Sequence, residues 1–326
     1  MVKMLCHYIR HRCPILETLL WLMCRATLTR SYWSNSVGLY SLLHACLHNH
    51  MTWVPAVHRW ITTSVAVMRW SLPVAAKQQI HRLIRSEWLS NVKYGDRTLQ
   101  KYDILQEFEW SLSTYDLGTM GSILIWHITT DICDNDLSKL FSTTAGGNTR
   151  PRIDNAAEIA DCWEAATVLS NYCAYLLLQA PELVTDEVHD EQLLKEAVQE
   201  GIQRHFRRQG CRRSKVDAMF ATLRDFMRSG GEAKFTGDVV LADGVKLGKQ
   251  LLSRMDDKVS WWNLPAEMWV ELLLTVAPSE YVTGHVKLLA TGAELITHLW
   301  ALLGIIKRPP KPTLAAPYLR HYHELI

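Results

Sequence analysis

The sequence predicts an all-α protein, an irregular multi-helix bundle with long loops and no significant sheet. Three observations support this prediction: apolar residues recur at helical spacing, the longest apolar run suits a buried helix, and glycine- or proline-rich stretches separate the helical segments. With 326 residues, of which 48% are apolar and 21% charged, the chain can bury a sizeable core. Its composition excludes disordered and collagen-like proteins.

The first three predicted helices rest on different patterns. The run from Ile15 to Leu28 contains Glu17 and Arg25, so it is too short and too polar to span a bilayer and is predicted as an amphipathic or core helix. The stretch from Ser122 to Ile132 is rich in β-branched residues, as strands are. A single strand would have no partner in a helical chain, so we predict a helix there. The run from Ala156 to Leu178 predicts a long buried helix.

Two further helices and three connections complete the prediction. Apolar residues at every fourth position predict a helix over Glu191–Phe206, and a second apolar pattern predicts one over Val216–Met227. Glycines and a proline predict a loop over Ser142–Asn155, and four glycines predict another over Ser229–Gly244. The proline-rich stretch Lys307–Pro317 predicts an extended tail.

The charge of the chain is unevenly distributed. Residues 1–100 carry twelve Lys or Arg and three Asp or Glu, a balance of +9; because the whole chain carries +2, the remainder carries −7. Six of the thirteen tryptophans also lie in residues 1–100. Cations interleaved with amphipathic indoles favour contact with an anionic membrane surface, and the alternative is a basic face over a Trp-containing core. We predict three segments: a basic, Trp-rich helical region (1–100), a helical domain (101–306) and a basic, proline-rich tail (307–326).

The eight cysteines predict a reducing compartment. They are scattered along the chain, no pair has CxxC spacing, and no cleavable signal peptide is recognisable. We therefore expect free thiols in a cytosolic environment.

The stretch Leu288–Leu303 combines an apolar run with two ionisable residues one turn apart, Glu294 and His298. We favour a central core helix, Leu288–Ile306, in which these two side chains form a buried polar pair and Gly292 permits a close helix approach. A membrane span is an alternative, because the run lacks Lys and Arg and is flanked by them. An acid–base or metal site is another, although two residues are fewer than the three protein ligands of a catalytic zinc.

The densest group of potential metal ligands lies in "HACLHNH" and comprises His44, Cys46, His48 and His50. Recognised zinc modules use two spaced pairs of ligands, and this spacing does not match them. We predict a helix end with solvated histidines, and neither a metal nor another cofactor.

A basic run, "RHFRRQGCRRSK", holds six cations in twelve residues: Arg204, Arg207, Arg208, Arg212, Arg213 and Lys215. Such a run suits anionic lipid, nucleic acid or an importin, and the alternative is a solvated connection between helices. No nucleic-acid-binding motif accompanies the run, so we expect anionic lipid rather than nucleic acid.

The familiar enzyme motifs are missing from the sequence. There is no GxSxG, HExxH, GxGxxG or P-loop, and "DICDND" (Asp131–Asp136) lacks both the spacing and the glycine of a calcium loop. We therefore predict a non-enzymatic protein.

Seven phrases of the sequence occur together in one known family. They are "YWSNSVGLYSLLHACL" (Tyr32–Leu47), "YDILQEFE" (Tyr102–Glu109), "SILIWHITTDIC" (Ser122–Cys133), "LSNYCAYLLL" (Leu169–Leu178), "LADGVKLGKQLL" (Leu241–Leu252), "EMWVELLL" (Glu267–Leu274) and "LLATGAELITHLW" (Leu288–Trp300). In this order they resemble the plant family, much expanded in grasses, of domain of unknown function 594, usually joined to the membrane-spanning domain of unknown function 4220. The resemblance runs from about Ile15 to about Leu303, and it implies no reaction or catalytic residue.

The sequence departs from that family in four places, one of which is the tail after Ile306, and both resemblance and composition shape the functional prediction. The usual glycine pair before the glutamate is Gly292-Ala293 here, and Trp110–Gly121 resembles an insertion. The N-terminal membrane spans of the family are expected to be missing. We predict a helical interaction or regulatory domain at the cytosolic face of a membrane, with an anionic surface and a protein as partners. The alternatives are a cytoplasmic location, a metal-dependent enzyme, or a nucleic-acid-binding protein that uses residues 204–215.

Overall fold

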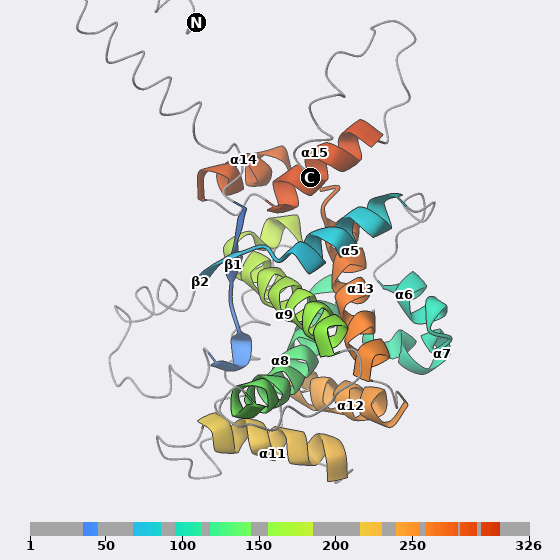
Figure 1. The fold of residues 1–326 in the computed structure, drawn as a ribbon. Helices are drawn as coiled ribbons and strands as arrows, with labels where there is room; N and C mark the ends of the chain where they lie inside the picture. Colours follow the sequence, from blue (N-terminus) through green and yellow to red (C-terminus); the bar gives the residue numbers. More distant parts are fainter. Residues whose placement is uncertain are drawn as a thin grey trace, which may run out of the picture. The chain divides into compact units, whose positions relative to one another are not determined.

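The structure is a computed structural model that describes ten stretches of the chain. These are residues 35–44, 68–85, 95–112, 118–144, 156–184, 216–229, 239–254, 258–279, 281–291 and 295–306. The chain divides into two compact units, Met1–Asn35 and Ser36–Ile326, and all elements below belong to the second (Figure 1).

The described part is mostly helical, which confirms the all-α prediction. One small antiparallel sheet accompanies the helices (Figure 1). In chain order the elements are β1 (Ser36–Leu39), β2 (Met68–Ser71), α5 (Val74–Arg85), α6 (Asp96–Lys101), α7 (Leu105–Phe108), the 3-10 turn η2 (Glu109–Ser111), α8 (Gly118–Thr144), α9 (Ala156–Gln179), the 3-10 turn η3 (Pro181–Leu183), α11 (Val216–Ser229), α12 (Val239–Arg254), α13 (Lys258–Val276), α14 (Val282–Thr291) and α15 (Leu295–Ile306).

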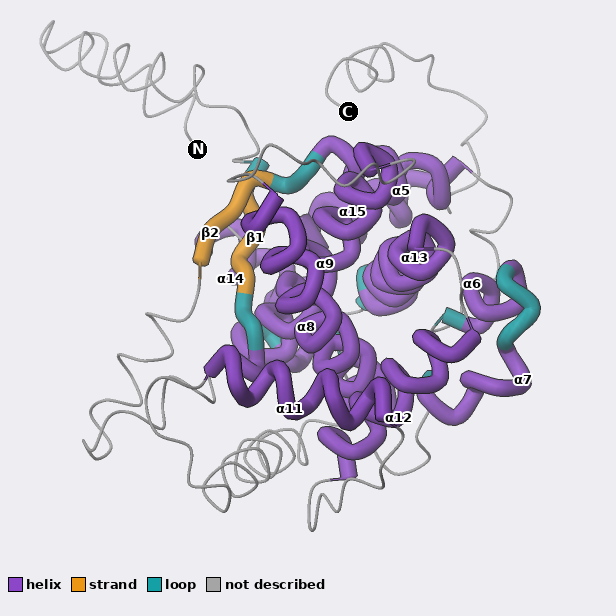
Figure 2. The backbone as a smooth tube through the Cα atoms, turned by 60° about the horizontal axis from the view of Figure 1, so that its bottom comes forward, coloured by secondary structure: helices purple, strands orange, loops and turns teal. Residues whose placement is uncertain are grey.

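Three long apolar helices, α8, α9 and α13, form the core of this unit. Helix α9 packs against both α8 and α13, and each of the three contributes a fully buried aromatic side chain: Trp126, Tyr172 and Trp269. Burying side chains of this size stabilises the fold by roughly 2–3 kcal/mol each. Helices α11 and α12 cover α8, while α5 packs against α9 and α13 (Figure 2).

Helix α8 confirms the choice of helix over strand for Ser122–Ile132. It is 27 residues long, and the β-branched residues of its stretch Ser122–Ile132 are buried, with α9, α11 and α12 packed against the helix. Tertiary packing therefore outweighs the strand preference of these residues. The predicted helices over Ala156–Leu178 and Val216–Met227 are also confirmed, as α9 and α11.

The two strands pair antiparallel, with Val37 opposite Trp70 in the register. Strand β1 packs on α9, where a Cβ atom on Gly38 would lie 2.6 Å from the ring of Tyr175. A side chain at position 38 would therefore separate the strand from the helix.

Helix α12 corrects the predicted loop over Ser229–Gly244. It begins at Val239, so the last six residues of the predicted loop are helical. Gly244 lies where α12 crosses α8: a Cβ atom there would be 2.6 Å from Ile128 Cγ2. The Thr129 hydroxyl also donates a hydrogen bond of 2.7 Å to the Gly244 carbonyl. This glycine permits close helix packing rather than a turn, which the sequence pattern alone does not distinguish.

The predicted single core helix over Leu288–Ile306 is wrong. Helix α14 ends at Thr291 and α15 begins at Leu295. The imidazole of His285 stacks on Trp300 with 4.7 Å between ring centroids. In one continuous helix these two residues would be about 22 Å apart along the axis. The central position belongs to α8, α9 and α13, and α15 has an exposed side.

Among the described residues, no helix combines the length and apolar character that crossing a bilayer requires. The predicted helices over Ile15–Leu28 and Glu191–Phe206, and the tail 307–326, lie outside the described residues. The division into segments at residues 100 and 306 stays a prediction.

Replacing Gly244 with alanine should lower the free energy of unfolding by roughly 1–3 kcal/mol, because Ile128 is fully buried and cannot move aside freely. Gly304 is the matched control, because nothing lies within 4 Å of the position that a Cβ atom would take there, and alanine at this position should be neutral or stabilising by up to about 1 kcal/mol. Urea denaturation of both variants measures the difference. Equal effects at the two glycines would contradict the packing role of Gly244.

Candidate functional site

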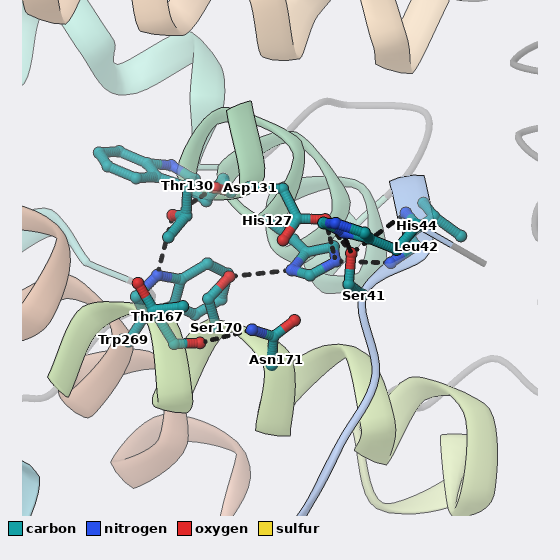
Figure 3. Close-up of polar contacts among 11 residues, drawn as sticks. Ser41, Leu42, His44, His127, Thr130, Asp131, Thr167, Ser170, Asn171 and Trp269 are labelled. Carbon is teal, nitrogen blue, oxygen red and sulfur yellow. Dashed lines mark hydrogen bonds and ion pairs between the residues drawn. The ribbon is translucent and has the colours of Figure 1, made fainter. Parts of the chain in front are cut away.

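Buried polar side chains on α8 form the most extensive polar cluster of the described residues. They face the segment 36–44 on one side and α9 on the other (Figure 3). The cluster is built around His127 and Asp131, which are one helical turn apart and both buried. The side chains that complete it come from positions 41, 44 and 170.

Both ring nitrogens of His127 are engaged. The backbone N–H of Leu42 donates a hydrogen bond of 3.0 Å to Nε2, so Nε2 carries no proton. The single proton of the neutral ring is therefore on Nδ1, which donates to Ser170 Oγ over 2.9 Å. Burial lowers the pKa of His127 and favours this neutral form, although the nearby Asp131 carboxylate opposes the shift.

Ser41 connects Asp131 to the surface. Its hydroxyl donates to Asp131 Oδ2 over 2.6 Å, and its oxygen accepts the backbone N–H of His44 over 3.2 Å. The exposed His44 ring lies 2.9 Å from the same oxygen through Nδ1. Ser41 is thus the N-cap of the helical turn that begins at Leu42, and the buried carboxylate holds the cap in place.

Asp134 extends the cluster by one turn. It accepts a hydrogen bond of 2.7 Å from Trp163 Nε1 on α9. Burial and the neighbouring Asp131 carboxylate raise the pKa of Asp134 to about 6, while the Trp163 hydrogen bond opposes the shift. The pKa rises because Asp134 is largely buried and a second carboxyl group lies close to it, and both disfavour a negative charge on Asp134.

Serine, histidine and aspartate are also the residue types of a nucleophilic triad. Here Ser170 is only 1% exposed, and the Nε2 atom that would act as a base already accepts the Leu42 amide. The arrangement joins α8, α9 and the segment 36–44, and its buried serine, Ser170, is not accessible to solvent.

A second buried acceptor, Glu271 on α13, holds α6. Its carboxylate accepts the backbone N–H of Thr98 over 2.9 Å and the Thr98 hydroxyl over 2.7 Å. The Arg97 N–H contributes a third bond of 3.3 Å. One turn earlier on α13, Glu267 pairs with Lys101 at 2.6 Å near the surface. The first turn of α6 is therefore capped by a helix far away in the sequence.

A third cap joins α9 to α15. The Ile296 N–H, in the first turn of α15, donates to the Tyr172 hydroxyl over 3.0 Å. Burial raises the pKa of Tyr172 far above its ordinary value, so the group stays a neutral phenol. Helix α14 is attached to α15 by stacking of His285 on Trp300 and by the contact of His285 with Thr297, and burial lowers the pKa of His285.

The structure describes only some of the predicted site residues. His44 is exposed, bonded to Ser41 and 4.9 Å from the Phe220 ring, and Cys46, His48 and His50 lie outside the described residues. His298 is exposed rather than buried, and Glu294 lies outside the description, so their pairing stays a prediction. The six cations of residues 204–215 are also outside it. Within the described stretches, no three His, Cys, Asp or Glu side chains are grouped to hold a metal ion.

The sequence analysis missed the polar residues that join the helices. His127 and Glu271 each stand in an apolar run, "SILIWHITTDIC" and "EMWVELLL". Because burying an unpartnered polar group is costly, such a residue in a buried helix signals a partner elsewhere. The sequence does not show that this partner is a backbone amide.

Comparison with known proteins gives one match. Residues 254–305, which include α13, α14 and nearly all of α15, match the family described as "Protein of unknown function, DUF594". This confirms the resemblance to domain 594, whereas the plant origin and the accompanying domain 4220 are not shown by it. No curated protein and no solved structure matches the chain.

Replacing Glu271 with alanine should lower the free energy of unfolding by about 2–4 kcal/mol, because the buried Thr98 amide and hydroxyl and the partly buried Arg97 amide lose their acceptor. Glu267→Ala is the matched control one turn away, and it should cost at most about 1 kcal/mol because its Lys101 partner is exposed. Urea denaturation gives both values. Similar losses for the two variants would contradict the capping role.

Replacing Asp134 with asparagine should change how stability depends on pH. The folded state holds the Asp134 proton more tightly than the unfolded chain, so this carboxyl lowers the free energy of unfolding as the pH rises from about 4 to about 6. The variant should be about 1–3 kcal/mol more stable than the parent at pH 8 and nearly equal to it below pH 4. Denaturant titrations across this range measure the difference, and a constant difference at all pH values would refute the raised pKa.

Proposed function

Starting from the match to domain 594, we propose that this chain is a non-enzymatic helical interaction or regulatory domain acting at the cytosolic face of a membrane. In this proposal its direct contact is the anionic surface of the bilayer, and a protein at the same membrane is a further partner. Nucleic acid is not an expected partner.

The observation that carries the proposal is the absence of acidic residues from several described stretches, which include α5 and α15 at one end of the helical unit. The stretches 68–85, 281–291 and 295–306 contain no Asp or Glu, although the whole chain has 33. The stretch 35–44 also contains none, but it extends to α11, where His44 lies against Phe220. Helix α5 alone carries Lys77, Arg82 and Arg85. Both views show α5 and α15 at the same end of the unit, with α11 and α12 at the opposite end (Figures 1 and 2). One acid, Glu182 in η3, lies next to α14.

The same stretches carry exposed apolar side chains. Among the described residues, five of the six large hydrophobic side chains that are exposed belong to them: Trp70 (53%), Val74 (66%), Tyr281 (42%), Val282 (52%) and Val286 (60%). The sixth is Leu252 on α12 (41%). Tryptophan and tyrosine favour the headgroup layer, valines gain by leaving water, and cations gain about 1 kcal/mol each near anionic lipid. Described stretches that combine such side chains with cations and contain no Asp or Glu suit a peripheral membrane contact.

Three further observations support the proposal. The balance of +9 in residues 1–100 is on the same part of the chain as β2 and α5. The buried polar side chains of His127, Glu271 and Tyr172 bind backbone amides, which is a structural use. Cys133, Cys162 and Cys173 are buried free thiols, as expected for a reducing compartment.

Binding of the full chain to vesicles tests the proposal. We expect co-sedimentation with phosphatidylcholine vesicles that contain phosphatidylserine, little binding to pure phosphatidylcholine, and a steep decrease as salt rises to about 0.5 M. The double variant Val282→Asp/Val286→Asp and the variant Trp70→Ala should each weaken binding about tenfold or more.

The matched control is Leu252→Asp, which changes an exposed apolar side chain on α12 and should leave binding unchanged. Arg207, Arg208, Arg212 and Arg213 changed together to Gln test the separate contribution of the basic run. Equal affinity for neutral vesicles, an equal loss with Leu252→Asp, or displacement of the vesicles by RNA would overturn the proposal.

A further inference from the structure

The segment 36–44 lies where the second compact unit begins, directly after Asn35, the last residue of the first unit. It is attached to the helical core by a short series of hydrogen bonds. Besides pairing with β2, the segment donates the Tyr40 N–H to the Asn171 carbonyl over 3.1 Å and the Leu42 N–H to His127 Nε2 over 3.0 Å. The Ser41 hydroxyl donates to Asp131.

Of these attachments, the one to His127 depends on the protonation state of the acceptor. The Leu42 N–H requires a lone pair on Nε2, and this lone pair exists only while the ring is neutral. A proton on Nε2 would point an N–H group at the Leu42 N–H. It would also convert the 3.4 Å contact between Nε2 and Asp131 Oδ2 into an ion pair. Asp131 would then be less available to the Ser41 hydroxyl.

We infer that His127 is a proton-sensitive latch: protonation of its Nε2 atom releases Leu42 and Ser41 and thereby detaches the segment 36–44 from α8. All residues of the latch belong to the second compact unit. The latch does not depend on whether the chain binds membranes.

The groups around the latch determine the pH at which it opens. On α8, Asp131 favours the protonated ring, and Asp134 lies close to Asp131; from the segment 36–44, His44 disfavours it. The side that α9 presents contributes the neutral Ser170 hydroxyl, and α11 places Phe220 against His44. Burial has the largest effect on the pKa of His127, which therefore lies below the ordinary value of 6.5.

Because burial lowers the pKa of His127 in the folded state, the attachment of the segment 36–44 becomes weaker as the pH falls. The folded state binds the His127 proton less tightly than the unfolded segment does, so the attachment is complete above about pH 6.5 and weakens as the pH falls towards the lowered folded-state pKa. The latch is therefore closed at neutral pH and weakens as the pH falls below about 6.5.

Hydrogen exchange of the full chain, followed by mass spectrometry, tests the inference. After correction for intrinsic exchange rates, the peptide that contains residues 36–44 should lose protection by up to about tenfold between about pH 7.5 and about pH 5.5. In the variant His127→Gln the amide oxygen still accepts a hydrogen bond but does not titrate. Protection of the same peptide should then be independent of pH.

His285→Gln is the matched control, because His285 is also a buried histidine with a lowered pKa but belongs to α14. It should leave the pH response of residues 36–44 unchanged. A parent protein without a pH response, or a His127→Gln variant with the same response as the parent, would overturn the inference.

If His127→Gln does not fold, nitrogen NMR of the imidazole rings in the parent protein tests the inference instead. The inference requires that the His127 ring is neutral with its proton on Nδ1 at about pH 7.5, and that in the folded protein it gains a second proton only below pH 6.5. A ring that is already protonated at neutral pH, or that carries its single proton on Nε2, would disprove it.

Discussion

The capping of helix N-termini by side chains from other helices is the interaction on which this fold depends. The first-turn amides of a helix have no acceptor within the helix, and burying them without a partner is costly. Here the three core helices each supply one acceptor: His127 on α8 takes the Leu42 amide, Tyr172 on α9 takes that of Ile296, and Glu271 on α13 takes that of Thr98. Each cap fixes where a peripheral segment begins on the core.

These caps explain why polar residues stand in helices that are otherwise apolar. A buried histidine, tyrosine or glutamate is costly alone, and a buried amide is costly alone, but the hydrogen bond between them removes both costs. Because the acceptor has to face one particular amide, the pair also specifies the position of the docked helix. Apolar contacts around Trp126, Tyr172 and Trp269 supply most of the stability and little of this specificity.

Periodicity and composition were sufficient to predict the helical class, α9 and α11, and the helix over Ser122–Ile132. They failed where the decisive contact is distant in the sequence. In the sequence Gly244 resembles a loop residue, and only the structure shows that Ile128 packs against it. The apolar run at Leu288–Ile306 resembles a single helix, and only the stacking of His285 on Trp300 shows that one straight helix does not continue through it. His127 was missed for the same reason, since its partner is an amide 85 residues away.

The three caps also differ in chemistry, and this difference explains why only one of them responds to protons. A carboxyl group keeps an oxygen lone pair whether or not it is protonated, and a phenol keeps its lone pairs at neutral and acidic pH. An imidazole nitrogen loses its only lone pair when it binds a proton. The Thr98 and Ile296 amides therefore keep an acceptor in Glu271 and Tyr172 throughout this pH range, whereas the Leu42 amide keeps one only while His127 is neutral. Of these three caps, only the one made by His127 therefore depends on protons, and it holds the segment 36–44 with which the second unit begins.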